Sequence, residues 1–93
     1  MFHENGRLKQ KGSYKDGKKD GVWKSYYDNG QLEFIDSYKE GNQDGDYEWY
    51  LKNGQLFWKG SYKEGKMDGY WESYYENGIL EKIELYKDGK LIN

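Results

Sequence analysis

The chain has 93 residues, of which 34% are hydrophobic and 19% aromatic, with 13 glycines and neither proline nor cysteine. This length excludes a second independent domain, the aromatic content excludes a disordered chain, and the missing proline and cysteine exclude collagen, a disulfide framework and a cysteine metal site. The 15 basic and 17 acidic residues give a net charge of −2, so the basic excess that nucleic-acid binding needs is absent.

The pair Asn5-Gly6 is the first member of a repeat. Asn-Gly returns at intervals of 24 residues, and columns of leucine and tyrosine keep the same spacing. The members of these columns are Asn29, Asn53 and Asn77; Leu8, Leu32, Leu56 and Leu80; and Tyr14, Tyr38, Tyr62 and Tyr86. This periodicity predicts one repeat domain over residues 1–93, with a partial repeat at 1–21 and repeats at 22–45, 46–69 and 70–93.

Each repeat contains two apolar runs separated by glycine-bearing breaks, which predicts a β-hairpin. In the first full repeat, residues 22–27 form the outgoing strand, and Asn29-Gly30 supplies the two positive-φ positions of a tight hairpin turn. Residues 31–39 return, and the break at 40–45 reverses the chain into the next hairpin. The sequence therefore predicts an all-β fold, an elongated antiparallel array of hairpins in one meandering sheet.

Aromatic rings occupy both faces of the predicted sheet. Trp23, Tyr47 and Trp71 recur every 24 residues, and large rings bury about 150–250 Å² each, enough to replace a scarce aliphatic core. By strand alternation Tyr26, Tyr50 and Tyr74 point to the opposite face. We expect one set of rings to be partly exposed and able to recognise a protein, a glycan or a quaternary ammonium group.

The segment at 14–30, Tyr-Lys-Asp-Gly-Lys-Lys-Asp-Gly-Val-Trp-Lys-Ser-Tyr-Tyr-Asp-Asn-Gly, resembles the MORN repeat, and more closely its bacterial MORN-like variant. The likeness extends over nearly the whole chain through the aromatic-x-x-Gly-x-x-acid-Gly breaks at 14–21, 38–45 and 62–69. The resemblance implies a hairpin array that acts chiefly as a scaffold or interaction module. It also implies two narrower roles, because some eukaryotic members are linked to phosphoinositide membranes and some bacterial variants are described as antitoxins.

The sequence departs from the usual MORN repeat at two columns. Asp20, Asp44 and Asp68 stand where the repeat often has histidine, and Trp23, Tyr47 and Trp71 stand where it commonly has glycine. These departures argue against transferring lipid binding from the family.

Candidate catalytic and metal-binding residues are few. His3 is the one histidine, so neither a zinc site nor a Ser-His-acid triad can be assembled. The strand carboxylates alternate with lysines at positions expected to be solvated, and the turn acids offer too few oxygens for calcium. These strand acids are Glu33, Asp36, Glu48, Glu72, Glu81 and Glu84. We therefore predict no catalytic residue, no cofactor, no metal and no enzymatic activity.

The residues that break the periodic columns are the best candidates for contact with a partner. Trp49, Phe57 and Trp58 are the first choice, followed by Tyr26, Tyr50 and Tyr74 on the other face. The predicted function is a non-catalytic protein–protein interaction module or scaffold, whose partner is another protein of unknown identity. Unpaired edge strands add a route to a homodimer.

Three other functions stay open. One is peripheral binding to anionic lipid such as phosphoinositides, the second is an antitoxin-like binding protein, and the third is a small-ligand or glycan binder. Membrane association is not favoured, because an acid follows every lysine of the column Lys15, Lys39, Lys63 and Lys87. Neither a membrane span nor a signal peptide is visible, which favours a soluble protein of the cytoplasm but leaves the compartment open.

Overall fold

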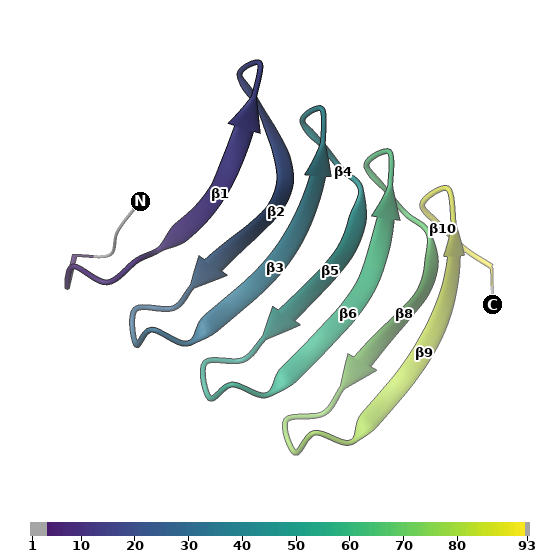
Figure 1. The fold of residues 1–93 in the computed structure, drawn as a ribbon. Coiled ribbons are helices and arrows are strands. Elements are labelled where there is room, and N and C mark those ends of the chain that lie inside the picture. Colours follow the sequence, from purple (N-terminus) through teal and green to yellow (C-terminus); the bar gives the residue numbers. More distant parts are fainter. Residues whose placement is uncertain (1–3, 93) are drawn as a thin grey trace.

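The computed structural model describes residues 4–92, which form one layer of antiparallel strands (Figure 1). The ten strands follow the order β1-β2-β3-β5-β6-β8-β9-β10, with β4 paired to β3 and β7 paired to β6. The long strands are β1 (Gln10–Lys15), β2 (Lys18–Tyr26), β3 (Leu32–Lys39), β5 (Gly45–Tyr50), β6 (Leu56–Lys63), β8 (Gly69–Tyr74) and β9 (Leu80–Lys87). The two-residue strands are β4 (Asn42–Gln43), β7 (Lys66–Met67) and β10 (Lys90–Leu91).

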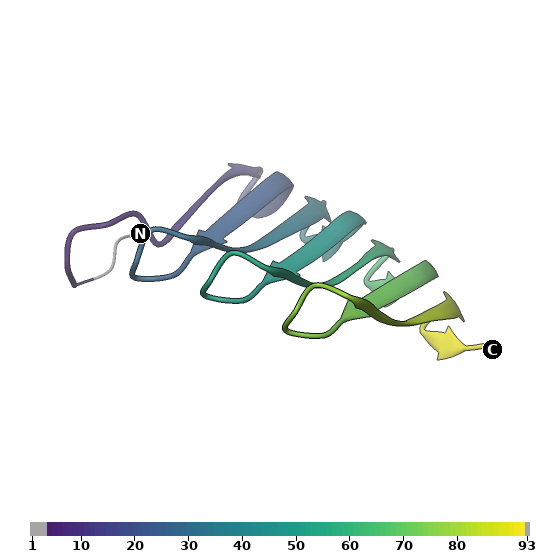
Figure 2. The same ribbon diagram turned by 90° about the horizontal axis from the view of Figure 1, so that it is seen from below.

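The molecule measures 43 × 39 × 13 Å, and its short dimension is that of a single sheet with its side chains. Figure 2, which looks along the layer, shows successive hairpins side by side without a second layer. The predicted all-β array of antiparallel hairpins is confirmed. His3 lies outside the described residues.

The two kinds of turn differ from the prediction. The tight two-residue turns lie at the acid-Gly pairs, where Asp16 and Gly17 have φ of 51° and 80° between the paired residues Lys15 and Lys18. The same geometry recurs at Glu40-Gly41, Glu64-Gly65 and Asp88-Gly89. The predicted six-residue break at 40–45 is therefore only a two-residue turn, after which the chain at once enters β4.

The prediction that Asn29-Gly30 supplies two positive-φ positions is wrong, because in this loop only Gly30 has a positive φ, of 88°. Tyr27 N–H donates to the Gln31 carbonyl at 2.8 Å, so three residues separate the closing pair instead of two. A three-residue hairpin loop needs one left-handed residue, at its last position, and glycine takes it without strain.

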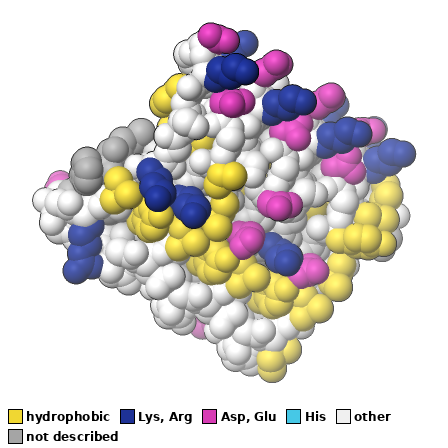
Figure 3. Space-filling view, viewed as in Figure 1, with side chains coloured by type: hydrophobic (Ala, Val, Ile, Leu, Met, Phe, Trp, Pro, Cys, Tyr) yellow, Lys and Arg dark blue, Asp and Glu magenta, His cyan; other side chains and the backbone are white. Residues whose placement is uncertain are grey.

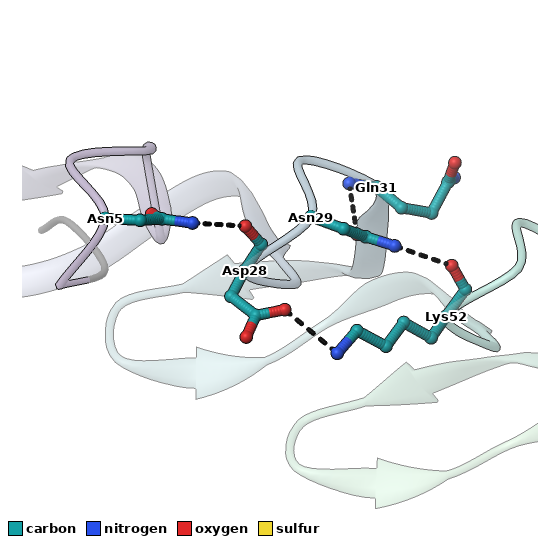
Figure 4. A network of polar contacts seen from close by, with 5 residues as sticks. All are labelled: Asn5, Asp28, Asn29, Gln31 and Lys52. Carbon is teal, nitrogen blue, oxygen red and sulfur yellow. Dashed lines mark hydrogen bonds and ion pairs between the residues drawn. The ribbon is translucent and has the colours of Figure 1, made fainter.

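The Asn-Gly loops are also joined from one repeat to the next (Figure 4). Asn5 Nδ2 donates to the Asp28 carbonyl at 2.7 Å, and Asn29 Nδ2 donates to the Lys52 carbonyl at 3.1 Å. The Asn29 carboxamide oxygen accepts from Gln31 N–H within its own loop, at 2.9 Å. A 3.0 Å ion pair joins Lys52 to Asp28, but both side chains are 60% exposed, so this pair adds little stability. The carboxamide of every asparagine in this column fixes its own loop, and those of Asn5 and Asn29 also tie the loop to the next repeat.

The core lies on one face of the sheet, which we call the ring face. Trp23 on β2 and Trp71 on β8 are its most buried hydrophobic side chains, 6% and 1% exposed, and Tyr47 on β5 stands between them in the repeat. Rings of the returning strands surround this column. The neighbouring ring-face residues are Phe34, Tyr38, Trp58 and Tyr62.

Two strand glycines leave the space in which the buried tryptophans pack. A Cβ added to Gly60 would lie 2.1 Å from Cδ2 of Trp71, and one added to Gly12 would lie 2.1 Å from the same atom of Trp23. The two indole N–H groups donate to strand carbonyls, Trp23 to Ser13 at 3.0 Å and Trp71 to Ser61 at 3.1 Å. Each indole therefore lies flat on the preceding strand, and only glycine leaves room for it.

The opposite face, which we call the polar face, carries a row of cross-strand neighbours of mixed character. The row consists of Lys24, Ile35, Glu48, Lys59, Glu72 and Ile83. Figure 3 shows a hydrophobic band on this face, interrupted by charged side chains, and alternating lysines and acids along the edge formed by the acid-Gly turns. Val22 and Tyr70 are 54% and 65% exposed here, so this face carries no closed core.

Candidate functional site

Trp49, Phe57 and Trp58, the first predicted contact residues, lie together on the ring face and are called the ring cluster below. Trp49 of β5 pairs with Trp58 of β6, whereas the next pair is Tyr50 with Leu56. This register shift leaves Phe57 as an extra residue, as in a β-bulge. The rings of Trp49 and Phe57 meet edge to face, with centroids 5.3 Å apart.

The same register shift recurs in the neighbouring repeats, but with polar residues. Between β2 and β3 the extra residue is Glu33, and Ser25 Oγ donates to its carboxylate at 3.1 Å. Between β8 and β9 the extra residue is Glu81. The ring pair Trp49–Phe57 thus stands where the other repeat has the hydrogen-bonded pair Ser25–Glu33. The fold does not require rings at this position.

The other predicted contact residues belong to the polar face, so the structure does not bring all six together, but Tyr74 lines the same hollow as Phe57. Tyr50 OH donates to Glu48 Oε1 at 2.7 Å, and Tyr74 OH donates to a carboxylate oxygen of Glu72 at 2.5 Å. The hydrogen bond to Glu48, followed by burial, raises the pKa of Tyr50 to about 12. Tyr26 is half-buried on the same face. Their part in partner contact stays a prediction.

A cavity of about 140 Å³ opens on the ring face between Trp23 and Tyr47. The predicted solvated position of Asp36 is wrong, because Asp36 lines this cavity and is only 3% exposed. Its carboxylate accepts a hydrogen bond from Ser37 N–H and another from Gln43 Nε2, both at 2.9 Å. The signal was present in the sequence, because Asp36 falls between Phe34 and Tyr38 in the two-residue alternation of one face.

Lys19 lies beside the same cavity. Its Nζ is 4.8 Å from the centroid of the Trp23 ring and 4.9 Å from that of Tyr38, both within the range of a cation–π contact. The cavity therefore has aromatic walls, a buried carboxylate and a cation over two of its rings. Sequence reasoning missed this arrangement.

The model of the MORN repeat variant matches the chain four times, over residues 1–16, 19–40, 43–66 and 67–88. The chain belongs to this family. Comparison with curated proteins and with solved structures finds no match. MORN repeats are generally non-catalytic binding or scaffold modules, which agrees with the expected class of function.

The described part of the chain contains no group of side chains suited to binding a metal ion. Within residues 4–92, no three His, Cys, Asp or Glu side chains are grouped so that they could hold a metal ion. Over the same range no helical segment is capable of crossing a bilayer.

The raised pKa values of two ring-face tyrosines predict that the MORN sheet loses stability at alkaline pH. Burial is the main reason that the pKa of Tyr38 and that of Tyr47 rise from 10.0 to about 12. Above pH 10 the unfolded chain releases these protons first and binds fewer than the folded chain, so the free energy of unfolding falls as the pH rises toward 12. Below pH 10 this contribution is fully present.

Urea unfolding followed from about pH 9 to about pH 11.5, together with the ultraviolet absorbance of tyrosinate, measures this effect. The double variant Tyr38→Phe/Tyr47→Phe is the control, because it lacks the two groups and should lose less stability over the same interval. Equal slopes for the two proteins would contradict the assignment.

Proposed function

We propose that this MORN repeat chain is a non-catalytic protein–protein interaction module and that the ring cluster is its contact with the partner. The observation that carries the proposal is Phe57, an aromatic residue at a bulge position that the flanking repeats fill with glutamate. Tryptophan and other large side chains dominate the binding energy of protein interfaces, and they act as clusters.

The geometry around the ring cluster supports this role. A hollow of about 480 Å³ lies next to Phe57 and is bounded by Tyr74, Tyr75 and Glu81. Tyr75 is 52% exposed, so a second aromatic surface faces the same hollow. A partner side chain placed there would contact rings on two sides, with a polar rim around them.

Binding to anionic lipid is the weaker candidate. The turn lysines and the acids that follow them alternate along one edge of the sheet (Figure 3), so the field at that edge is close to neutral. Flotation with phosphoinositide-containing vesicles at low salt tests it, and absence of association removes it. An antitoxin role would be one instance of the proposed protein binding, with a toxin as the partner.

The experiment compares the wild-type chain with Phe57→Glu as immobilised baits. Glu33 and Glu81 show that the bulge accepts glutamate, so we expect the variant to fold and to lose its partner by about tenfold or more. Glu33→Gln, at the same bulge of another repeat, is the matched control and should retain the partner. Light scattering of each protein identifies the case in which the partner is a second copy. Equal capture by all three baits, or no capture by the wild type, contradicts the proposal.

A further inference from the structure

The ring face has a gap that its other rings do not fill. Phe34, Tyr47 and Trp71 form a connected series, with centroids 6.2 Å apart for Phe34–Tyr47 and 5.9 Å apart for Tyr47–Trp71. Trp23 contacts Tyr14 instead, at 5.1 Å, and among the ring pairs found in residues 4–92 none joins it to this series. The cavity of about 140 Å³ occupies the break, with Asp36 at its wall.

The charge in this gap is not balanced by an ion pair. The ion pairs found within residues 4–92 join Lys52 to Asp28 and Lys82 to Glu84, and neither includes Asp36. One carboxylate oxygen of Asp36 accepts a hydrogen bond from Ser37 N–H and the other accepts one from Gln43 Nε2, and the Tyr38 side chain also hydrogen-bonds to this carboxylate. A carboxylate has about four lone-pair sites, so these three donors leave room for a further one. Lys19 and Lys24 also line the cavity, but neither forms an ion pair with Asp36. A buried carboxylate that forms no ion pair favours the entry of a cation.

The repeat itself shows that the fold does not need this carboxylate. The column of Asp36 has glycine at positions 12 and 60, where the tryptophan of the next strand fills the space, and Glu84 as its fourth member. In the middle repeat the ring of that column is the smaller Tyr47. Two departures from the repeat thus coincide at one place and together leave a cavity with a negative wall.

We propose that this cavity binds the guanidinium group of an arginine on the partner protein, an inference that rests on the proposed function. A guanidinium is planar, so it can donate to both oxygens of one carboxylate while its faces stack on rings such as Trp23 and Tyr47. The cavity is close in size to one of about 150 Å³ that accepts a benzene ring. Lys19 shows that a cation is stable over Trp23 and Tyr38, two rings of this cavity, and its half-buried side chain can move aside when the arginine enters.

The test titrates the isotope-labelled wild-type chain with the capped peptide acetyl-Gly-Arg-Gly-amide and follows the Trp23 indole N–H and the Ser37 amide by NMR. The same peptide with citrulline, which has the shape of arginine without its charge, is the reference ligand. We expect saturable shifts at both signals with arginine and affinity about tenfold weaker with citrulline. A lysine peptide should also be weaker, because an ammonium cannot match both oxygens.

Variants separate the carboxylate from the rest of the surface. Asp36→Asn keeps the shape and should weaken arginine binding about tenfold, whereas Asp46→Asn, an exposed acid of the polar face, should leave it unchanged. Lys19→Gln should tighten binding about threefold, because a competing cation is removed. Equal affinity for the arginine and citrulline peptides, or an absence of shifts at Trp23, overturns the proposal even if Asp36→Asn does not fold.

The outcome is independent of the ring-cluster test. Phe57→Glu should bind the arginine peptide as the wild type does, since Phe57 is not in the wall of the cavity. Failure of the peptide therefore removes the arginine site alone, and failure of the bait comparison removes the proposed function.

Discussion

Replacing Gly60 with alanine should lower the free energy of unfolding by about 3 kcal/mol, more than a single methyl group costs at most sites. The new Cβ would lie 2.1 Å from Cδ2 and 2.3 Å from Cε2 of Trp71, distances at which the indole or the strand must move. Trp71 cannot yield easily, because it is 1% exposed and its N–H is bonded to Ser61. Gly60 has no positive φ, so the whole effect is steric. Urea unfolding at neutral pH measures it.

Two further variants separate this explanation from a general intolerance of the strand. Lys59→Ala changes the exposed neighbour on the polar face and should alter the free energy of unfolding by less than about 0.5 kcal/mol. Gly12→Ala makes the same clash with Trp23 in β1, which is an edge strand and can shift, so its cost should be smaller. A Gly60→Ala variant as stable as the wild type would show that the indole is not fixed on this glycine.

The neighbouring strands β3 and β5 suggest a compensating change. β3 carries Asp36 in the column of Gly60, and β5 carries the smaller Tyr47 in the column of Trp71. The double variant Gly60→Ala/Trp71→Tyr should therefore lose less free energy of unfolding than the two single variants lose in sum, with a coupling of about 1 kcal/mol or more.

The sequence predicts the strands well because their signal is repeated. Asn-Gly and the tyrosine column recur in register, and a strand that appeared in one repeat had to appear in the others. The pairing of returning and outgoing strands follows from the short breaks, which permit only antiparallel neighbours. Family, fold class and the face of the Trp23 column could be predicted in this way.

Turn geometry could not be read from the same pattern. Asn29-Gly30 is a strong signal for a two-residue turn, but Tyr27 and Gln31 close the loop and so include Asp28. The acid-Gly pairs form the two-residue turns, since the flanking Lys15 and Lys18 are the paired residues. Asp-Gly is typical of such a turn, whereas the left-handed glutamates Glu40 and Glu64 are unusual. The closing pair determines the turn, and it depends on the register of the whole sheet.

The candidate site was predicted in part. Trp49, Phe57 and Trp58 were found as departures from the columns, and the bulge that gathers them depends on backbone register that the sequence does not display. The sequence analysis predicted that Asp36 is exposed to solvent, because acids and lysines alternate along the strands. The two-residue alternation of the strand faces, however, puts Asp36 on the same face as Phe34. The packing of the Trp71 indole on Gly60 could also have been predicted, since a glycine inside a strand often marks the close approach of another group.

Replacing Trp71 with alanine should have the largest effect on the fold, about 4 kcal/mol in the free energy of unfolding. The indole is the most buried large side chain of the described chain, and its ring contacts Tyr47, Trp58 and Tyr62 at centroid distances of 5.9, 5.1 and 5.2 Å. Its removal would open a cavity at the centre of the ring series and leave the Ser61 carbonyl without its donor. In a single-layer sheet no second layer can collapse onto that cavity.

Trp49→Ala is the matched variant, because it removes the same side chain from a half-buried position in the ring cluster. It should cost less than half as much stability and should still weaken partner binding, whereas Trp71→Phe should lose stability to an intermediate degree with partner binding intact. Urea unfolding and near-ultraviolet circular dichroism measure the stability and packing of the three variants, and bait capture measures their partner binding. Together these measurements show whether stability and binding depend on different tryptophans. Equal destabilisation by Trp49→Ala and Trp71→Ala would mean that the ring cluster belongs to the core, and it would remove the main argument for placing the partner there.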